Sequence, residues 1–300
     1  MMPRRSFIAA SAAGTFLAVS SYGFGQTAAS AREPETGYAP VNGLRLYYEI
    51  HGTGEPLILL HGGLGSTGMF SEVLPTLSSS RRVIAVDLQA HGRTTDIDRP
   101  LTFEAMADDI VALMKYLEIE KANVMGYSLG AGVALRTTVR HPNLVRKLVV
   151  VSIPFKHDGW YPEILATMSQ IGPAAAEQMK QSPIYQLYAR VAPNPANWAV
   201  LVTKVGALVN KDYDWAQDVA GIKAPTMIVF GDADSVRPEH IVQFFELLGG
   251  GKKEGGWDGS GISSARLAIL PGLTHYNIFA SPVLASTVIP FLEVAMPAVK

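Results

Sequence analysis

The chain has 300 residues, 48% of them hydrophobic and 17% charged, and its formal net charge is −1. This composition predicts a chain that folds around a sizeable core. The chain has no excess of basic residues that would attract nucleic acid or an anionic membrane. Cysteine is absent, which excludes disulfides, thiolate metal sites and cysteine catalysis.

The first 31 residues resemble an export signal rather than part of a fold. Arg4 and Arg5 precede a weakly apolar run over 7–19, and Ala29-Ser30-Ala31 offers a small-residue cleavage site. The run is shorter than the roughly 20 residues that span a bilayer. We therefore expect twin-arginine export to the periplasm or the medium, with no stable membrane anchor after cleavage.

Beyond residue 38 the hydrophobic pattern predicts strands that alternate with helices. Strands are expected over 44–50, 56–60, 82–86, 123–125, 147–152, 225–230 and 266–270, and helices over 69–77, 103–117, 128–140, 238–248 and 282–294. Gly52-Thr53-Gly54 is a turn signal that predicts a hairpin beside strand 44–50. The alternation predicts an α/β fold, with a mostly parallel sheet and helices on both faces.

Two segments interrupt this alternation. Residues 155–222 lack strong strand signals and carry scattered proline and aromatic residues, so we predict a small helical cap there. The core is then formed by residues 32–154 and 223–300. The glycine-rich stretch from Gly249 to Ser264 is expected to be a mobile surface loop.

The strongest chemical signal is Gly126-Tyr127-Ser128-Leu129-Gly130, which matches G-x-S-x-G and lies between a predicted strand and a predicted helix. An abrupt strand-to-helix turn strains the turning residue, and flanking glycines remove Cβ atoms that would clash. The Ser128 hydroxyl would stand at a helix N-terminus, where amide dipoles favour negative charge. We predict that Ser128 is a nucleophile; the alternative is an idle serine in a glycine-rich turn.

A serine hydroxyl needs a base to take its proton. Among the seven histidines His275 is preferred, because it follows the last predicted strand. His157 opens the cap and is a weaker rival. The others are expected to be surface, packing or structural residues: His51, His61, His91, His141 and His240.

Two aspartates follow strand 225–230, in Gly231-Asp232-Ala233-Asp234, and either can orient the histidine and stabilise its imidazolium. Both lie near the strand end, so position does not separate them, and the spare one is expected to form a turn. Upstream, His61-Gly62-Gly63-Leu64 follows strand 56–60, and its glycines would let the backbone approach a substrate closely. The predicted oxyanion donors are the amides of Gly63 and Leu129.

Together these segments resemble the α/β-hydrolase superfamily, and most of all its capped single-domain branch of cofactor-free haloperoxidases, small esterases and C–C hydrolases. The segments that carry the resemblance are His61-Gly62-Gly63, Asp87 through Thr94, Gly126 through Gly130, Gly231 through Asp234, and Pro271 through His275. The resemblance implies an acid three residues after the strand-ending glycine, which favours Asp234 over Asp232. Ala90 departs from the family's usual glycine, which affects only a turn.

The predicted reaction is hydrolysis of a carboxylic ester or lactone through an acyl-enzyme. The substrate is expected to be a largely apolar small molecule, because the cap is rich in aromatic residues. The candidate pocket residues are Leu64, Trp160, Tyr161 and Trp198. Alternatives are C–C bond hydrolysis, cofactor-free perhydrolysis or haloperoxidase-like chemistry, and a ligand-binding protein without turnover. We expect no cofactor, no metal site and no nucleic-acid partner.

Overall fold

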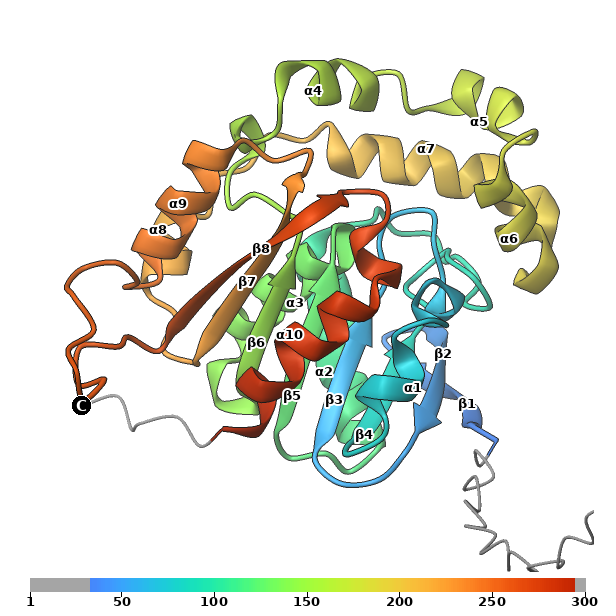
Figure 1. Ribbon diagram of the computed structural model, residues 1–300. Coiled ribbons are helices and arrows are strands. Elements are labelled where there is room, and N and C mark those ends of the chain that lie inside the picture. Colours follow the sequence, from blue (N-terminus) through green and yellow to red (C-terminus); the bar gives the residue numbers. More distant parts are fainter. Residues whose placement is uncertain (1–32, 295–300) are drawn as a thin grey trace, which may run out of the picture. The chain divides into compact units, whose positions relative to one another are not determined.

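The structure is a computed structural model that describes residues 33–294. Its centre is an eight-stranded sheet with the order β1-β2-β4-β3-β5-β6-β7-β8 (Figure 1). The strands are β1 (Glu35–Val41), β2 (Leu44–His51), β3 (Pro56–Leu60), β4 (Arg82–Val86), β5 (Ala122–Tyr127), β6 (Val145–Val151), β7 (Thr226–Ala233) and β8 (Ala265–Thr274). The β1–β2 and β2–β4 pairs are antiparallel, and every pair from β4 to β8 is parallel. The predicted export signal lies outside the described residues and stays a prediction.

Helices cover both faces of this sheet, as predicted for the α/β class. They are α1 (Leu74–Leu77), α2 (Phe103–Tyr116), α3 (Leu129–Arg140), α4 (Pro162–Met168), α5 (Pro173–Met179), α6 (Pro183–Val191), α7 (Trp198–Val209), α8 (Ala216–Ala220), α9 (Pro238–Leu247) and α10 (Pro282–Glu293). Within residues 33–294, five short 3₁₀ helices lie in the connecting segments: η1 (Thr67–Phe70), η2 (Pro142–Leu144), η3 (His157–Gly159), η4 (Pro195–Asn197) and η5 (Ile278–Ala280).

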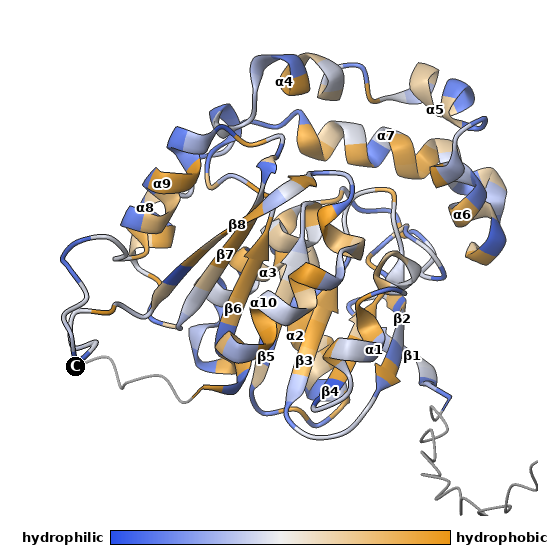
Figure 2. Ribbon diagram, in the orientation of Figure 1, coloured by the Kyte–Doolittle hydropathy of each residue, from blue (hydrophilic) through white to orange (hydrophobic). Residues whose placement is uncertain are grey.

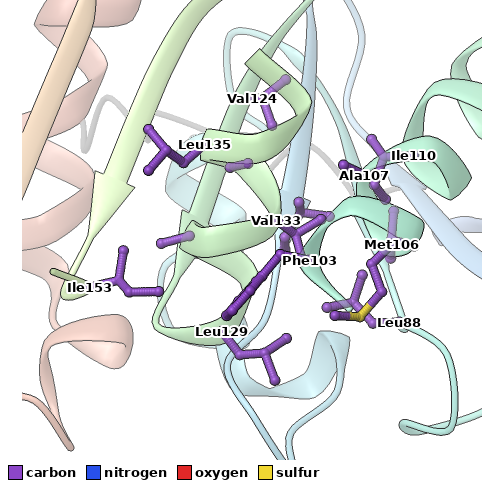
Figure 3. Packing of buried hydrophobic residues seen from close by; sticks show 14 of the residues in the cluster. Leu88, Phe103, Met106, Ala107, Ile110, Val124, Leu129, Val133, Leu135 and Ile153 are labelled. Carbon is purple, nitrogen blue, oxygen red and sulfur yellow. The ribbon is translucent and has the colours of Figure 1, made fainter. Parts of the chain in front are cut away.

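Two hydrophobic clusters hold the layers together, one on each face of the sheet. Because successive side chains of a strand point to opposite faces, Ile58 packs under α2 and α3 while Leu57 packs under α1 and α10. Figure 3 shows Phe103 of α2 against Leu129 and Val133 of α3 on the first face. The central strands are hydrophobic along their length, as burial on both faces requires (Figure 2).

The predicted hairpin forms at a different turn. β1 and β2 are joined by Asn42-Gly43, whose φ angles of 48° and 85° are those of a two-residue primed turn. Gly52 to Gly54 instead lead from β2 to β3, which are not neighbours because β4 lies between them. The sequence contained the correct Asn-Gly signal, and the prediction was wrong because it weighed the more conspicuous glycine pair.

Element boundaries also differ from the predictions where pairing extends a strand beyond its apolar run. β5, β7 and β8 each continue for several residues toward the site described below. The predicted helix over 69–77 is replaced by η1 and the four-residue α1. The glycine-rich stretch 249–264 contains no helix or strand, which agrees with the predicted loop.

The cap consists of α4 to α8 and lies between β6 and β7. Within the cap, the Trp198 ring of α7 packs on Tyr185 and Tyr188 of α6 at centroid distances of 5.4 and 5.2 Å. Trp198 and Tyr188 belong to the same hydrophobic cluster as Ile58 of the sheet. Lys204 Nζ ties α7 to the core by an ion pair of 2.6 Å with Asp96 Oδ2. None of the helices within residues 33–294 combines the length and apolar character that a membrane crossing needs.

Ala90 adopts a left-handed backbone conformation, with φ of 66°. Such a conformation costs a residue with a Cβ about 1–2 kcal/mol, and glycine avoids most of this cost. We expect Ala90→Gly to raise the free energy of unfolding by about 0.5–1 kcal/mol in urea titrations. Ala107→Gly is the control, because it lies inside α2 with ordinary helical geometry and should lower stability by about 1 kcal/mol. An equal loss of unfolding free energy in the two variants would contradict backbone strain at Ala90.

Candidate active site

Ser128 occupies the sharp turn between β5 and α3. Its φ and ψ are 52° and −120°, which confirms the strained backbone predicted for this position. The two flanking glycines are required by close approach: a Cβ on Gly126 would overlap the backbone of Gly130, and a Cβ on Gly130 would overlap the carbonyls of Leu60 and His61. The turn therefore presents the serine hydroxyl at the first turn of α3.

His275 follows β8 directly and reaches the serine. Its Nε2 lies 3.2 Å from Ser128 Oγ, although the two residues are separated by 147 positions in the chain. The His275 backbone carbonyl accepts a 2.6 Å hydrogen bond from the Tyr127 hydroxyl. Tyr127, which directly precedes Ser128, thus helps to hold His275 beside the serine.

Asp234 lies on the other side of this histidine, with its Oδ1 3.3 Å from His275 Nδ1. The carboxylate is almost fully buried and also accepts the amides of Gly231 and Val236. Burial acts to raise the pKa of Asp234, but the hydrogen bond and charge of His275, together with the hydrogen bonds from Ser152 and Gly231, hold this pKa below its ordinary value. An ionised Asp234 would fix the imidazole with its proton on Nδ1 and leave Nε2 free to accept one.

Asp232 is placed apart from this arrangement. Its side chain is exposed, and its Oδ1 accepts the amide of Gly272 at 2.8 Å in the adjoining turn of β8. This is the turn-forming position expected of the spare aspartate. The structure therefore brings Asp234, and not Asp232, to His275.

Ser152 was missed by the sequence analysis. It directly follows β6, is fully buried, and donates a 2.6 Å hydrogen bond from its hydroxyl to Asp234 Oδ2. Its φ of 55° is a second strained backbone angle at the site. No local pattern marks such a serine, because its partner is 82 positions away. The available signal was only its place at the carboxyl end of a buried strand.

The predicted oxyanion donors lie side by side. A Cβ on Gly63 would sit 3.5 Å from Leu129 Cδ1, and the neighbouring Leu64 has a left-handed φ of 61°. Within residues 33–294, neither the Gly63 amide nor the Leu129 amide donates a hydrogen bond to another protein group. Both N–H groups are thus available to a ligand beside Ser128.

His61 fixes the Gly62–Gly63 peptide group, which carries the Gly63 N–H. Its Nδ1 is 2.7 Å from the Gly62 carbonyl, and its Nε2 accepts the Leu88 amide at 3.1 Å, so the proton is on Nδ1. Burial lowers the pKa of His61 to about 4 and keeps the ring neutral. The structural role predicted for His61 agrees with these bonds.

A cavity of about 740 Å³ opens beside Ser128, Gly63, Leu129 and His275. Its remaining walls are mainly apolar, and no aspartate or glutamate within residues 33–294 lines it. Leu64 and Trp160 are part of the lining, as predicted. Tyr161 and Trp198 are not, which corrects two of the four pocket residues.

Trp198 packs inside the cap, and the backbone of Tyr161 bonds to Ser235. Trp198 is fully buried, and its Nε1 donates to the Ala176 carbonyl at 2.9 Å, so it joins α5 to α7. The Tyr161 amide donates to the Ser235 carbonyl at 3.1 Å, and the residue precedes the first turn of α4. Aromatic character alone does not say which cap residues pack and which line a cavity.

The remaining histidines do not join the site. His51 contacts Glu49, His141 contacts Asp108, and the Nε2 of His157 lies 3.0 Å from the Val209 carbonyl. His91 is fully buried, with Nδ1 2.8 Å from the Gln89 carbonyl, and His240 stacks on Phe155 at a centroid distance of 4.0 Å. Within residues 33–294, no group of three or more potential ligand side chains could hold a metal ion.

Three buried histidines should make stability depend on pH. Burial lowers the pKa to about 4 for His61, to about 3 for His91 and to about 4 for His240. The unfolded chain therefore binds more protons than the folded chain once the pH falls below about 6.5, and this difference costs up to about 1.4 kcal/mol per pH unit for each group. The contribution of these neutral histidines to the free energy of unfolding is expected to be fully present above about pH 6.5 and to be lost as the pH approaches 4.

Melting temperatures measured between pH 8 and 4.5 check this expectation. His240→Phe retains a ring against Phe155 and removes one titrating group, so its melting temperature should fall less steeply with acid. A wild-type melting temperature that is flat from pH 7 to 4.5 would contradict the proposed neutral histidines.

Comparison with known proteins places this chain in a family. A family model described as the alpha/beta hydrolase fold matches residues 55–190. A putative carbamate hydrolase, RutD, of Caulobacter sp. strain K31 is 31% identical over 224 residues, which are 64% of this chain and 80% of that protein. The chain belongs to the α/β-hydrolase family.

Two further similar proteins agree with this family assignment. The 2-hydroxymuconate semialdehyde hydrolase of Pseudomonas sp. strain CF600 is 36% identical over 113 residues, 36% of this chain and 40% of that protein. The structure of the carboxylesterase CesB from Bacillus subtilis superposes with a TM-score of 0.68, covering 88% of this chain and 93% of that one at 20% identity. At that identity the structural match establishes the fold alone.

Proposed function

We propose that this hydrolase cleaves carboxylic esters or lactones of largely apolar small molecules, with Ser128 as nucleophile, His275 as general base and Asp234 as the orienting acid. The observation that carries the proposal is the continuous contact from Ser128 Oγ through His275 to Asp234, at 3.2 and 3.3 Å. A carboxylesterase among the structural neighbours supports it at the level of fold.

In the proposed reaction, Ser128 Oγ attacks the carbonyl carbon while His275 Nε2 takes the hydroxyl proton. The carbonyl oxygen becomes negative and accepts the amides of Gly63 and Leu129. The bond between the carbonyl carbon and the leaving oxygen then breaks as His275 gives its proton to that oxygen. The alcohol departs, and the acyl group remains as an ester on Ser128 Oγ. Water attacks this ester, His275 takes its proton and returns it to Ser128 Oγ, and the carboxylic acid leaves.

Covalent labelling tests this function. A fluorophosphonate probe should add one phosphonyl group per folded chain, and peptide mass spectrometry should locate it on Ser128. Heat-unfolded protein is the control and should not be labelled. Folded protein that is not modified at Ser128 would defeat the proposal.

The similarity to a 2-hydroxymuconate semialdehyde hydrolase supports one alternative reaction. The same nucleophile, base and acid could cleave a C–C bond next to a ketone. Incubation with a panel of p-nitrophenyl esters and a vinylogous diketone separates the two. Release of p-nitrophenol favours the ester function, whereas turnover of the diketone alone would replace it.

Ser152 is proposed to position Asp234. Loss of a short hydrogen bond to a charged group costs about 1.5–3 kcal/mol, and part of this cost would raise the activation free energy. We expect Ser152→Ala to lower kcat/KM about tenfold and to move the acid limb of its pH profile, because the carboxylate that faces His275 loses a donor. Profiles with p-nitrophenyl acetate measure this shift. A lower melting temperature with an unchanged pH profile would mean that Ser152 is only structural.

A further inference from the structure

The cavity beside Ser128 has two chemically different ends. Around His275 its wall is aromatic: the ring centroids of Tyr127, Trp160 and Tyr276 lie 5.3, 5.4 and 5.4 Å from the imidazole. The wall contributed by the cap helices is mostly aliphatic, and includes Met168, Ile171, Met179, Leu187, Val191 and Val205. We call these the aromatic end and the aliphatic end.

The aliphatic end begins at the oxyanion loop. Val205 of α7 lies over Gly63, since a Cβ on that glycine would be 3.6 Å from Val205 Cγ1. The adjacent Gly206 packs against Ile171, which lines the same cavity. At the first residue of α7, Trp198 packs on α6, whose Leu187 and Val191 continue the lining. In Figure 1, α7 runs across the cap and meets α6 at the end opposite α8 and α9.

The proposed chemistry orients a substrate between these ends. The leaving oxygen must lie within hydrogen-bond reach of His275 Nε2 to receive its proton, so the alcohol part of an ester occupies the aromatic end. The carbonyl oxygen faces Gly63 and Leu129. The remaining substituent of the carbonyl carbon, the acyl group, then points away from His275 toward Val205.

We propose that the substrates are esters with a medium or long aliphatic acyl chain, which lies along α7 toward α6. This inference rests on the proposed ester hydrolysis and deepens it. Ile184 and Leu187 of α6 line the cavity and are 44% and 55% exposed, so the aliphatic end opens to solvent there. A long chain could project through this opening, and activity should rise with acyl length to a plateau rather than stop at a sharp limit.

The two arginines of the lining fit this arrangement. Arg93 Nη1 lies 3.4 Å from Asp87 Oδ2 and 3.5 Å from Glu49 Oε1, so its charge is balanced by two carboxylates of the protein. Arg190 is exposed on α6, where its head group can stay in water while its stem covers apolar surface. Neither requires a charged substrate.

A p-nitrophenyl ester series tests the chain preference, because the leaving group stays constant. Each methylene moved from water into an apolar site is worth about fourfold in affinity, so kcat/KM for the octanoate should exceed that for the acetate by at least about tenfold. Hydrolysis of the acetate as fast as the octanoate would overturn this inference and leave the ester function intact. Absence of hydrolysis and of the Ser128 adduct would overturn both.

A matched pair of variants tests the direction of the chain. Leu187→Glu places a charge at the aliphatic end, and Val200→Glu places one on the exposed side of α7, outside the cavity lining. Leu187→Glu should lower the ratio of kcat/KM for p-nitrophenyl octanoate to kcat/KM for the acetate about tenfold, while Val200→Glu should keep this ratio within about twofold of wild type. If Leu187→Glu instead impairs octyl acetate and spares p-nitrophenyl octanoate, the chain lies on the alcohol side and the inference is wrong.

Discussion

Ser128→Ala is expected to lower kcat/KM for p-nitrophenyl esters by about 10⁴-fold or more, because the variant lacks the oxygen that attacks the carbonyl. The residual rate would come from the Gly63 and Leu129 amides and from substrate binding. Initial rates with the octanoate and the acetate measure the loss. His275→Ala should cause a loss of similar size, and the double variant should be little worse than either single one, because the two groups act as a unit.

The fold of Ser128→Ala should be unchanged, since alanine retains the Cβ and the serine hydroxyl bonds, among residues 33–294, to His275 alone. Its circular dichroism spectrum and melting temperature serve as controls. A variant with normal melting and more than about one tenth of the wild-type rate would show that another nucleophile carries the reaction.

The second large effect concerns the two aspartates. Asp234→Asn is expected to lower kcat/KM about 10³- to 10⁴-fold, because an amide neither stabilises the imidazolium nor keeps the His275 proton on Nδ1. Asp232→Asn is the matched control. Its amide oxygen can still accept the Gly272 amide in the exposed turn, so its rate should remain within about twofold of wild type. Equal losses in the two variants would contradict the assignment of Asp234.

Much of the fold could be predicted because its signals are local. Pro56–Leu60 and Arg82–Val86 are continuous apolar runs and form β3 and β4 as predicted. Thr102 caps α2 by accepting the Ala105 amide, and Met106, Ile110 and Leu113 form its buried stripe. The turn at Ser128 could be predicted for the same reason, because two glycines and one serine within five residues mark it in the sequence.

The features that could not be predicted depend on contacts between distant segments. Position alone could not separate Asp232 from Asp234, because which one meets His275 depends on how the turn after β7 folds beside β8. Trp160 lines the cavity and Trp198 is buried inside the cap, although the two are chemically alike. Their difference arises from the packing of α5, α6 and α7, which sequence patterns describe poorly.

Rapid-quench mass spectrometry of the wild-type protein during turnover of p-nitrophenyl octanoate tests the central claim most directly. The proposed acyl-enzyme predicts a transient gain of one octanoyl group per chain, located on the peptide that contains Ser128, together with an equal burst of p-nitrophenol. Turnover with no acylation of Ser128 at any time, or acylation of a different residue, would contradict the account.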